Sequence, residues 1–282
     1  MNESDLSKLR KLPEDWWRYV RASQTLVEWF RRYIVGLIIR IRMTESAKTM
    51  IFTGFLLYYE DLLMWATAGH IIDDLLALQG DATIEVQPAR WADCCNITGA
   101  ESVLFDFSRL KMFSATSVGV DFGVAVLEGL DAKALMANRN VEIMTEQGWK
   151  NLEAAKPEGF YLIGYPDDWN TSIVDENARE IGFKADLACI PVEPLEYRGP
   201  DRDNKFWDIP DLFYGRMVFF VDRDVPFLNS AVGMSGGPLL SLERSDEGIV
   251  YRLFGVQRAS DKTNRENISV EPIGRILQIM QP

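Results

Sequence analysis

A serine set among glycines and the only histidine of the chain are the residues whose types could carry out nucleophilic chemistry together. The stretch GMSGGPLL contains Ser235, and the 282-residue chain has a single histidine, His70. A serine hydroxyl is a weak nucleophile until an imidazole accepts its proton, and a buried carboxylate orients that imidazole and stabilises its charged form. Catalysis by Ser235 therefore requires that the chain around residue 70 meets the chain around residue 235.

The order of these residues separates two folds that use such a serine. The stretch around Ser235 also satisfies G-x-S-x-G, the nucleophile turn of the α/β-hydrolases, but in that fold the histidine follows the serine. No histidine follows residue 235. The order His–Asp–Ser fits instead, with Asp121 at the head of the apolar run VDFGVAVL. Asp106 is a rival acid, but it sits inside the strand-like run LFDF.

The motifs around these residues resemble those of the trypsin-like (chymotrypsin-fold) serine peptidases. The similarity spans about residues 35–282, is strong at the three motifs and is loose between them. Six stretches carry it: TGFLL (53–57), TAGH (67–70), DFGV (121–124), LIGYP (162–166), GMSGGP (233–238) and FGVQRA (254–259).

The resemblance implies a catalytic role for each matched residue. Ser235 is implied as the nucleophile, His70 as the general base, and Asp121 as the acid that orients the base. The backbone N–H groups of Gly233 and Ser235 are implied as the oxyanion hole, where each donor is worth roughly 10²–10³ in rate.

Two positions depart from the secreted members of the family. Asn229 stands at the base of the primary specificity pocket, where trypsin-type enzymes have an aspartate, so strong selection for basic residues is not expected by that route. Gln257, Arg258 and Ala259 are implied at the edge of the same pocket. Met234 stands where zymogen-activated members have an aspartate that pairs with a newly cut N-terminus. Methionine cannot form that ion pair, so we expect activity without N-terminal cleavage.

Charge and composition argue against several classes of partner. With 30 basic and 42 acidic residues the formal net charge is −12, which repels phosphate backbones and anionic lipid, so neither nucleic acid nor membrane is expected as a partner. The N-terminus has no secretory pattern, and three cysteines (Cys94, Cys95 and Cys189) are an odd number, which favours a cytoplasmic location. One histidine and no zinc-type spacing predict neither metal nor cofactor.

Short strand-like runs predict the elements that must position these residues. They are rich in Val, Ile, Phe and Tyr and are separated by Gly, Asp, Asn or Pro, which is typical of an all-β fold. With the resemblance, they predict two antiparallel six-stranded β-barrels, an N-terminal helical extension and a C-terminal helix. The expected units are a helical extension (1–34), a first barrel with His70 and Asp121 (35–135), a linker with a helix (136–157), and a second barrel with Ser235 and the closing helix (158–282).

These observations favour a serine endopeptidase that acts on a protein or peptide substrate through an acyl-enzyme. Two other classes stay open: a catalytically silent binding or scaffold protein on the protease fold, and an esterase-like hydrolase with the same triad. The aromatic face of the N-terminal helix has two alternative roles as well. It packs on the chain's own first barrel, or it docks on a regulatory protein or a second copy of the chain.

Overall fold

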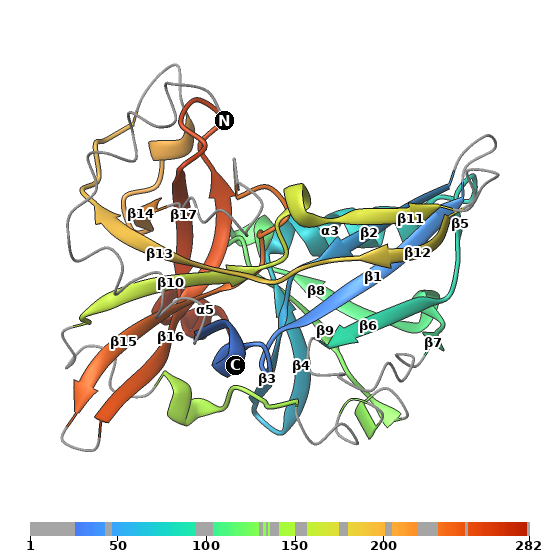
Figure 1. Cartoon of the computed structure of the whole chain (residues 1–282), viewed down its shortest axis with the longest axis horizontal. Coiled ribbons are helices and arrows are strands. Elements are labelled where there is room, and N and C mark those ends of the chain that lie inside the picture. The colour runs from blue at the N-terminus through green and yellow to red at the C-terminus, as the bar shows by residue number, and fades with distance from the viewer. Residues whose placement is uncertain are drawn as a thin grey trace.

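The computed structural model is dominated by strands, with few helices (Figure 1). The all-β class predicted from the short apolar runs is therefore confirmed. The structure describes residues 26–42, 47–93, 104–129, 132–133, 135, 141–149, 157–174, 180–200, 205–218, 231–245 and 248–280.

The C-terminal half forms a closed antiparallel barrel of six strands. Their order is β10-β13-β14-β17-β16-β15, and β15 pairs with β10 to complete the ring. Apolar side chains fill its interior, among them Leu162, Leu239 and Val270. This barrel lies where the second predicted barrel was expected. Its strands are β10 (Gly159–Gly164), β13 (Ala188–Leu195), β14 (Phe213–Met217), β15 (Pro238–Ser245), β16 (Gly248–Ser260) and β17 (Asn267–Pro272), and a separate hairpin joins β11 (Thr171–Val174) to β12 (Glu180–Lys184).

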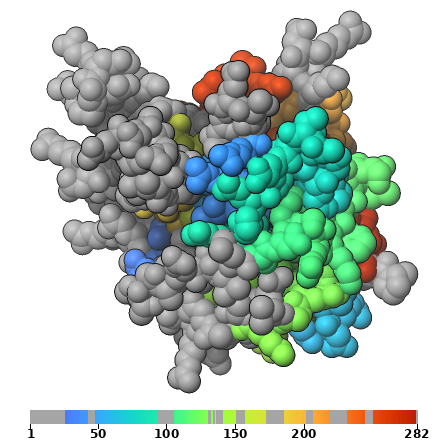
Figure 2. All heavy atoms as spheres, turned by 90° about the vertical axis from the view of Figure 1, so that its right-hand side faces the viewer, coloured from blue at the N-terminus to red at the C-terminus, as the bar shows by residue number. Residues whose placement is uncertain are grey.

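The described residues of the N-terminal half form two sheets, and the outer side of this half makes up the cyan-to-green surface in Figure 2. One sheet has the order β2-β1-β6-β7 with β5 paired to β1, and the other has the order β3-β4-β9-β8. Among the described residues, an isolated bridge between Ile34 and Phe55 links the chain near β1 to β3. A closed first barrel is not confirmed, because closure needs continuous strand pairing around the ring. The strands are β1 (Val35–Arg42), β2 (Ala47–Phe52), β3 (Phe55–Tyr59), β4 (Leu62–Thr67), β5 (Glu85–Val86), β6 (Ala89–Asp93), β7 (Leu104–Phe105), β8 (Lys111–Ser114) and β9 (Gly123–Val126).

Two longer helices accompany the strands in the described part of the chain. The predicted C-terminal helix is present as α5 (Ile273–Met280). The other, α3 (Gly69–Gly80), directly follows β4 and is absent from the sequence-based prediction. No helix in the described part of the chain is long and apolar enough to cross a membrane. Short 3-10 turns complete the elements: η1 (Phe107–Arg109), η2 (Thr116–Val118), η3 (Glu146–Gly148), η5 (Asp167–Trp169) and η6 (Lys205–Trp207).

Two predicted helical segments are described only in part. Residues 26–30 are helical, and the rest of the predicted N-terminal helix up to residue 25 lies outside the described residues. In the linker, residues 141–149 form the turn η3 and a parallel bridge from Met144 to Leu57 instead of the predicted helix, and residues 150–156 are not described. Extended backbone suits this segment because it lets Met144 reach the core while Glu142 pairs with Arg32.

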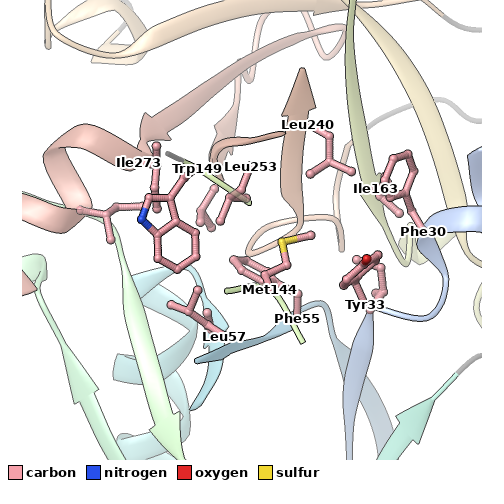
Figure 3. Packing of buried hydrophobic residues seen from close by; sticks show 14 of the residues in the cluster. Phe30, Tyr33, Phe55, Leu57, Met144, Trp149, Ile163, Leu240, Leu253 and Ile273 are labelled. Carbon is pink, nitrogen blue, oxygen red and sulfur yellow. The ribbon is translucent and has the colours of Figure 1, made fainter. Parts of the chain in front are cut away.

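A cluster of buried apolar side chains joins the two halves of the molecule. Figure 3 shows side chains from both halves pointing toward one another, among them Phe55, Leu57, Ile163, Leu240, Leu253 and Ile273. Phe30 and Tyr33, from the described end of the N-terminal segment, belong to this cluster, and the ring of Phe30 meets Tyr251 of β16 at a centroid distance of 4.7 Å. Burial of a side chain such as Phe30 contributes about 1.5–3 kcal/mol, so this cluster fixes the position of one half relative to the other.

Candidate active site

His70 is positioned by the junction between β4 and α3. It lies in the first turn of α3, whose buried face consists of Gly69, Ile71, Ile72 and Leu75. This face packs on β8 and β9, the strands on either side of the loop that carries Asp121. The turn that begins α3 therefore brings the imidazole to the chain segment that precedes β9.

Asp121 binds both the main-chain N–H and the imidazole ring of His70. The N–H of His70 donates to Asp121 Oδ1 at 2.8 Å, and Nδ1 lies 2.9 Å from Oδ2 and 3.2 Å from Oδ1. The side chain of Asp121 is only 12% exposed, whereas that of His70 is 44% exposed. A carboxylate only accepts hydrogen bonds, so the proton of neutral His70 resides on Nδ1 and Nε2 is left as a base.

Ser235 stands in a tight turn that glycines make possible. Gly233 and Gly236 have φ values of 87° and 86°, a backbone conformation that glycine adopts without steric cost. A Cβ on Gly236 would lie 2.0 Å from Thr67 Oγ1, and a Cβ on Gly233 would lie 2.6 Å from the backbone N of Asp167. Side chains at either position are therefore excluded by both backbone conformation and space.

Backbone hydrogen bonds and a buried methionine hold this turn against β16. The N–H of Gly236 donates to the carbonyl of Gln257 at 2.9 Å, and the N–H of Gln257 donates to Gly237 at 2.9 Å. Met234 is fully buried in the barrel interior. The residue before Ser235 therefore anchors the turn through apolar packing.

The candidate nucleophile, base and acid line one cavity of about 840 Å³. Ser235, His70 and Asp121 all contribute to its wall, together with Gly233 and Arg258. The hydroxyl of Ser235 donates to the carbonyl of Arg258 at 3.4 Å, not to the imidazole. That bond is long and weak, so the hydroxyl can turn from it at little cost.

Charges around the imidazole stabilise its protonated form. Burial opposes that form, but the hydrogen bond and charge of Asp121, helped by the charge of Asp74, outweigh burial and raise the pKa of His70 above its ordinary value. Arg258, whose Nε lies 3.8 Å from Asp121 Oδ2, acts in the opposite direction. His70 is therefore tuned as a somewhat stronger base than a free histidine.

Only some of the predicted substrate-binding residues line the cavity that contains Ser235. Arg258 and Ala259 line the cavity. Gln257 is fully buried and does not line it, and its amide has no hydrogen-bond partner within the described chain. Asn229 lies outside the described residues.

Other groups that could do chemistry lie elsewhere or are inert. Asp106 caps η1, where its carboxylate accepts from the N–H of Ser108 at 3.1 Å, and it is absent from the cavity wall. Cys189 is buried, and burial raises the pKa of its thiol well above the usual range, so it is a poor nucleophile. Cys94 and Cys95 lie outside the described residues. The described part of the chain has no group of three His, Cys, Asp or Glu side chains that could hold a metal ion.

Two buried residues at the site have contacts that sequence-based reasoning did not anticipate. Thr53 has a fully buried side chain whose hydroxyl donates to the carbonyl of Gly233 at 2.8 Å and accepts from the N–H of Tyr165 at 2.9 Å. Glu271 has a fully buried side chain, and its Oε1 accepts from the N–H of Asp121 at 3.0 Å. Thr53 lies in the TGFLL motif, but no local pattern marks either residue as a partner of the site.

Comparison with known proteins gives matches in structure only. No family model matches the sequence, and no curated protein matches it. Among solved structures, the chain is similar to the Rv3671c protease from M. tuberculosis in its active form, with 16% identity, 89% of this chain and 81% of that chain covered, and a TM-score of 0.45. It is also similar to the thermostable serine protease AL20 from an extremophilic microorganism, with 11% identity, coverage of 86% and 93%, and a TM-score of 0.44.

A third similar structure is the protease Anisep from Arthrobacter nicotinovorans, with 14% identity, coverage of 86% of this chain and 90% of that chain, and a TM-score of 0.41. All three of these solved structures are proteases.

Proposed function

We propose that this protein is a serine endopeptidase in which Ser235 is the nucleophile, His70 the general base and Asp121 the orienting acid. One observation carries the proposal. The only histidine of the chain binds Asp121 through Nδ1 at 2.9 Å, in the same cavity as a serine held between two glycines with positive φ. Nucleophile, base and orienter in one concave site are the parts that acyl transfer requires.

In the proposed acylation step, Ser235 Oγ attacks the carbonyl carbon of the scissile peptide bond. A C–O bond forms while the hydroxyl proton passes to His70 Nε2, and Asp121 stabilises the resulting imidazolium. The imidazolium then gives this proton to the leaving amine as the C–N bond breaks. A water molecule then gives a proton to the same imidazole and forms a C–O bond to the ester carbon. The bond from that carbon to Ser235 Oγ breaks, and the imidazolium returns the proton to Oγ.

The negative charge that develops on the carbonyl oxygen needs donors that are already in place. The N–H groups of Gly233 and Ser235 are the proposed oxyanion hole, since neither donates to a backbone carbonyl in the described part of the chain. Thr53 supports this geometry because its hydroxyl holds the Gly233 carbonyl at 2.8 Å. Preorganised donors need no rearrangement during the reaction and are worth roughly 10²–10³ in rate each.

Labelling by a fluorophosphonate tests the proposal directly, because only an activated serine reacts at an appreciable rate. We expect wild-type protein to be labelled once per chain, at Ser235, and a digest of a peptide library to give defined internal cleavages. Labelling with ester hydrolysis but no peptide cleavage would favour the esterase alternative. No labelling in folded protein would favour the silent scaffold.

The pH dependence of activity is expected to report His70. The base must be neutral, so kcat/KM should rise with pH, with a midpoint above the ordinary histidine value of about 6.5 because Asp121 and Asp74 raise the pKa despite burial. Replacing Asp74 with asparagine removes a negative charge and should move the midpoint to lower pH. A flat profile between about pH 5 and 9, measured with chemistry rate-limiting, would contradict an imidazole base.

A further inference from the structure

A fully buried carboxylate stands behind the acid of the proposed triad. Glu271 lies in β17 of the C-terminal barrel, whereas Asp121 lies in the N-terminal half just before β9. Glu271 Oε1 accepts from the main-chain N–H of Asp121 at 3.0 Å, and the side chain of Glu271 is 0% exposed. The bond therefore joins the two halves of the molecule at the residue that orients His70.

A carboxylate is a costly choice for such a position. Burying a charge costs several kcal/mol unless partners compensate it, and an apolar side chain avoids that cost. The partner here is Arg275 of α5, whose Nη1 lies 3.2 Å from Glu271 Oε2. This contact compensates charge by proximity, because neither atom makes a hydrogen bond of good geometry within the described part of the chain. Burial still raises the pKa of Glu271, against the opposing effects of the Asp121 N–H, Arg275 and Arg258.

The contacts of Arg275 point to the same segment of chain. Its Nη2 donates a long, weak hydrogen bond of 3.5 Å to the carbonyl of Gly119, two residues before Asp121. Glu271 thus holds the main chain of Asp121 from the barrel side, while the N–H and ring of His70 hold the carboxylate of Asp121 from the other side. A shift of the Asp121 main chain would change both bonds to His70 together.

We infer that Glu271 is a positioning residue of the site: its Oε1 fixes the main chain of Asp121 so that both carboxylate oxygens face His70. Arg275 serves to keep the buried carboxylate compensated, which gives the C-terminal helix a part in aligning the site. The inference deepens the proposed function and rests on it for its catalytic consequence. Its geometric consequence, the environment of His70, is measurable without any activity.

Two charge-matched double variants isolate the acceptor atom. Glu271→Gln with Arg275→Gln removes both charges and keeps an oxygen acceptor opposite the Asp121 N–H. Glu271→Met with Arg275→Leu removes the same charges and the acceptor, and apolar replacement of a buried ion pair is often neutral or stabilising, so this variant should fold. Glu243→Gln is the control, because Glu243 is a buried barrel carboxylate paired with Arg252 at 2.7 Å and does not line the cavity.

The single histidine makes the readout specific. In full-length protein labelled with ¹⁵N-histidine, the ring resonances titrate with the pKa of His70 alone. We expect the Met/Leu variant to lower this pKa relative to wild type and to lower kcat by roughly 10–100-fold with little change in KM, as expected for a misplaced catalytic group. The Gln/Gln variant and Glu243→Gln should keep the wild-type pKa and most of the turnover.

Each outcome decides a separate question. A folded Met/Leu variant with wild-type histidine titration would overturn the inference, as would an equal pKa change in the Gln/Gln variant, which would assign the effect to charge. Wild-type protein that neither cleaves peptides nor reacts with a fluorophosphonate would overturn the proposed function. The titration would still decide in that case whether Glu271 positions Asp121.

Discussion

Replacing Ser235 with alanine is expected to lower the turnover of peptide hydrolysis by about 10⁴-fold or more, because members of a triad act as a unit. The variant loses the attacking oxygen but keeps the glycine turn, the buried Met234 and the backbone bonds to β16. Far-UV circular dichroism and the melting temperature should therefore match those of wild type. Single-turnover and steady-state rates on a cleaved peptide from the library digest measure the loss.

Ser241 provides the matched control for this substitution. It lies on β15, six residues after Ser235, and its buried hydroxyl has no hydrogen-bond partner in the described part of the chain. Ser241→Ala should leave turnover unchanged and stability equal or slightly higher, because removing an unsatisfied buried polar group is not costly. Turnover by Ser235→Ala within a few-fold of wild type would rule out Ser235 as the nucleophile.

His70→Ala should cause a loss of the same size, and combining it with Ser235→Ala should cost little more. Without the imidazole the hydroxyl proton has no acceptor, so removing the hydroxyl as well takes away nothing that still functions. Additive losses would show that the two residues act independently and not as one unit. The comparison is clean because no second histidine can substitute as base.

The features of the site that could be predicted from sequence are those set by local chemistry. The turn at Ser235 needs glycine where φ is positive, and Gly233 and Gly236 have φ values near 87°. Asp121 was expected at the head of a strand, and it precedes β9 by two residues. The contact between His70 and Asp121 was expected from the motif resemblance, which implies that these residues are a base and its orienting acid, and the structure has this contact at 2.9 Å.

Helix α3 was not predicted because its first turn lacks the sequence features that usually mark a helix N-terminus. Its N-cap is Ala68, which makes no side-chain capping bond, and its first turn has no acidic residue. The apolar residues Ile71, Ile72 and Leu75 that follow His70 look equally like the end of a strand in a chain of short strands. Packing against β8 and β9 favours the helical conformation of this segment, and such packing cannot be predicted from the local sequence.

Contacts between the two halves were the least predictable part. Glu271 lies in the run NISVEP, where a glutamate after apolar residues is typical of an exposed strand position, yet it is fully buried. Its partner Asp121 is 150 residues away in the chain. The spacing of Glu271 and Arg275 by four residues is the one local signal of an ion pair, but it does not indicate that the pair is buried.

Replacing Asp121 with asparagine is the second change expected to cost about 10⁴-fold in turnover. The amide oxygen can still accept the N–H of His70, so the fold should persist, but the amide NH₂ would then face Nδ1. Nδ1 would have to accept a hydrogen bond and the ring proton would move to Nε2, which leaves no base toward Ser235. The reactivity of Ser235 toward a fluorophosphonate should fall with turnover, because both depend on the same base.

Asp106→Asn is the control that separates the two candidate acids. The side chain of Asp106 is 53% exposed and caps a 3-10 turn through Ser108, outside the cavity that holds His70. Its replacement should change turnover by less than about twofold and should lower stability only slightly, because the lost capping interaction is exposed to solvent. Equal losses at the two positions, or a larger loss at Asp106, would mean that the contact between Asp121 and His70 at 2.9 Å is structural and that the acid has been misassigned. Both substitutions remove one carboxylate oxygen and one negative charge, but only Asp121→Asn removes them from a position in contact with the imidazole. The larger of the two losses in turnover therefore identifies the acid that orients His70.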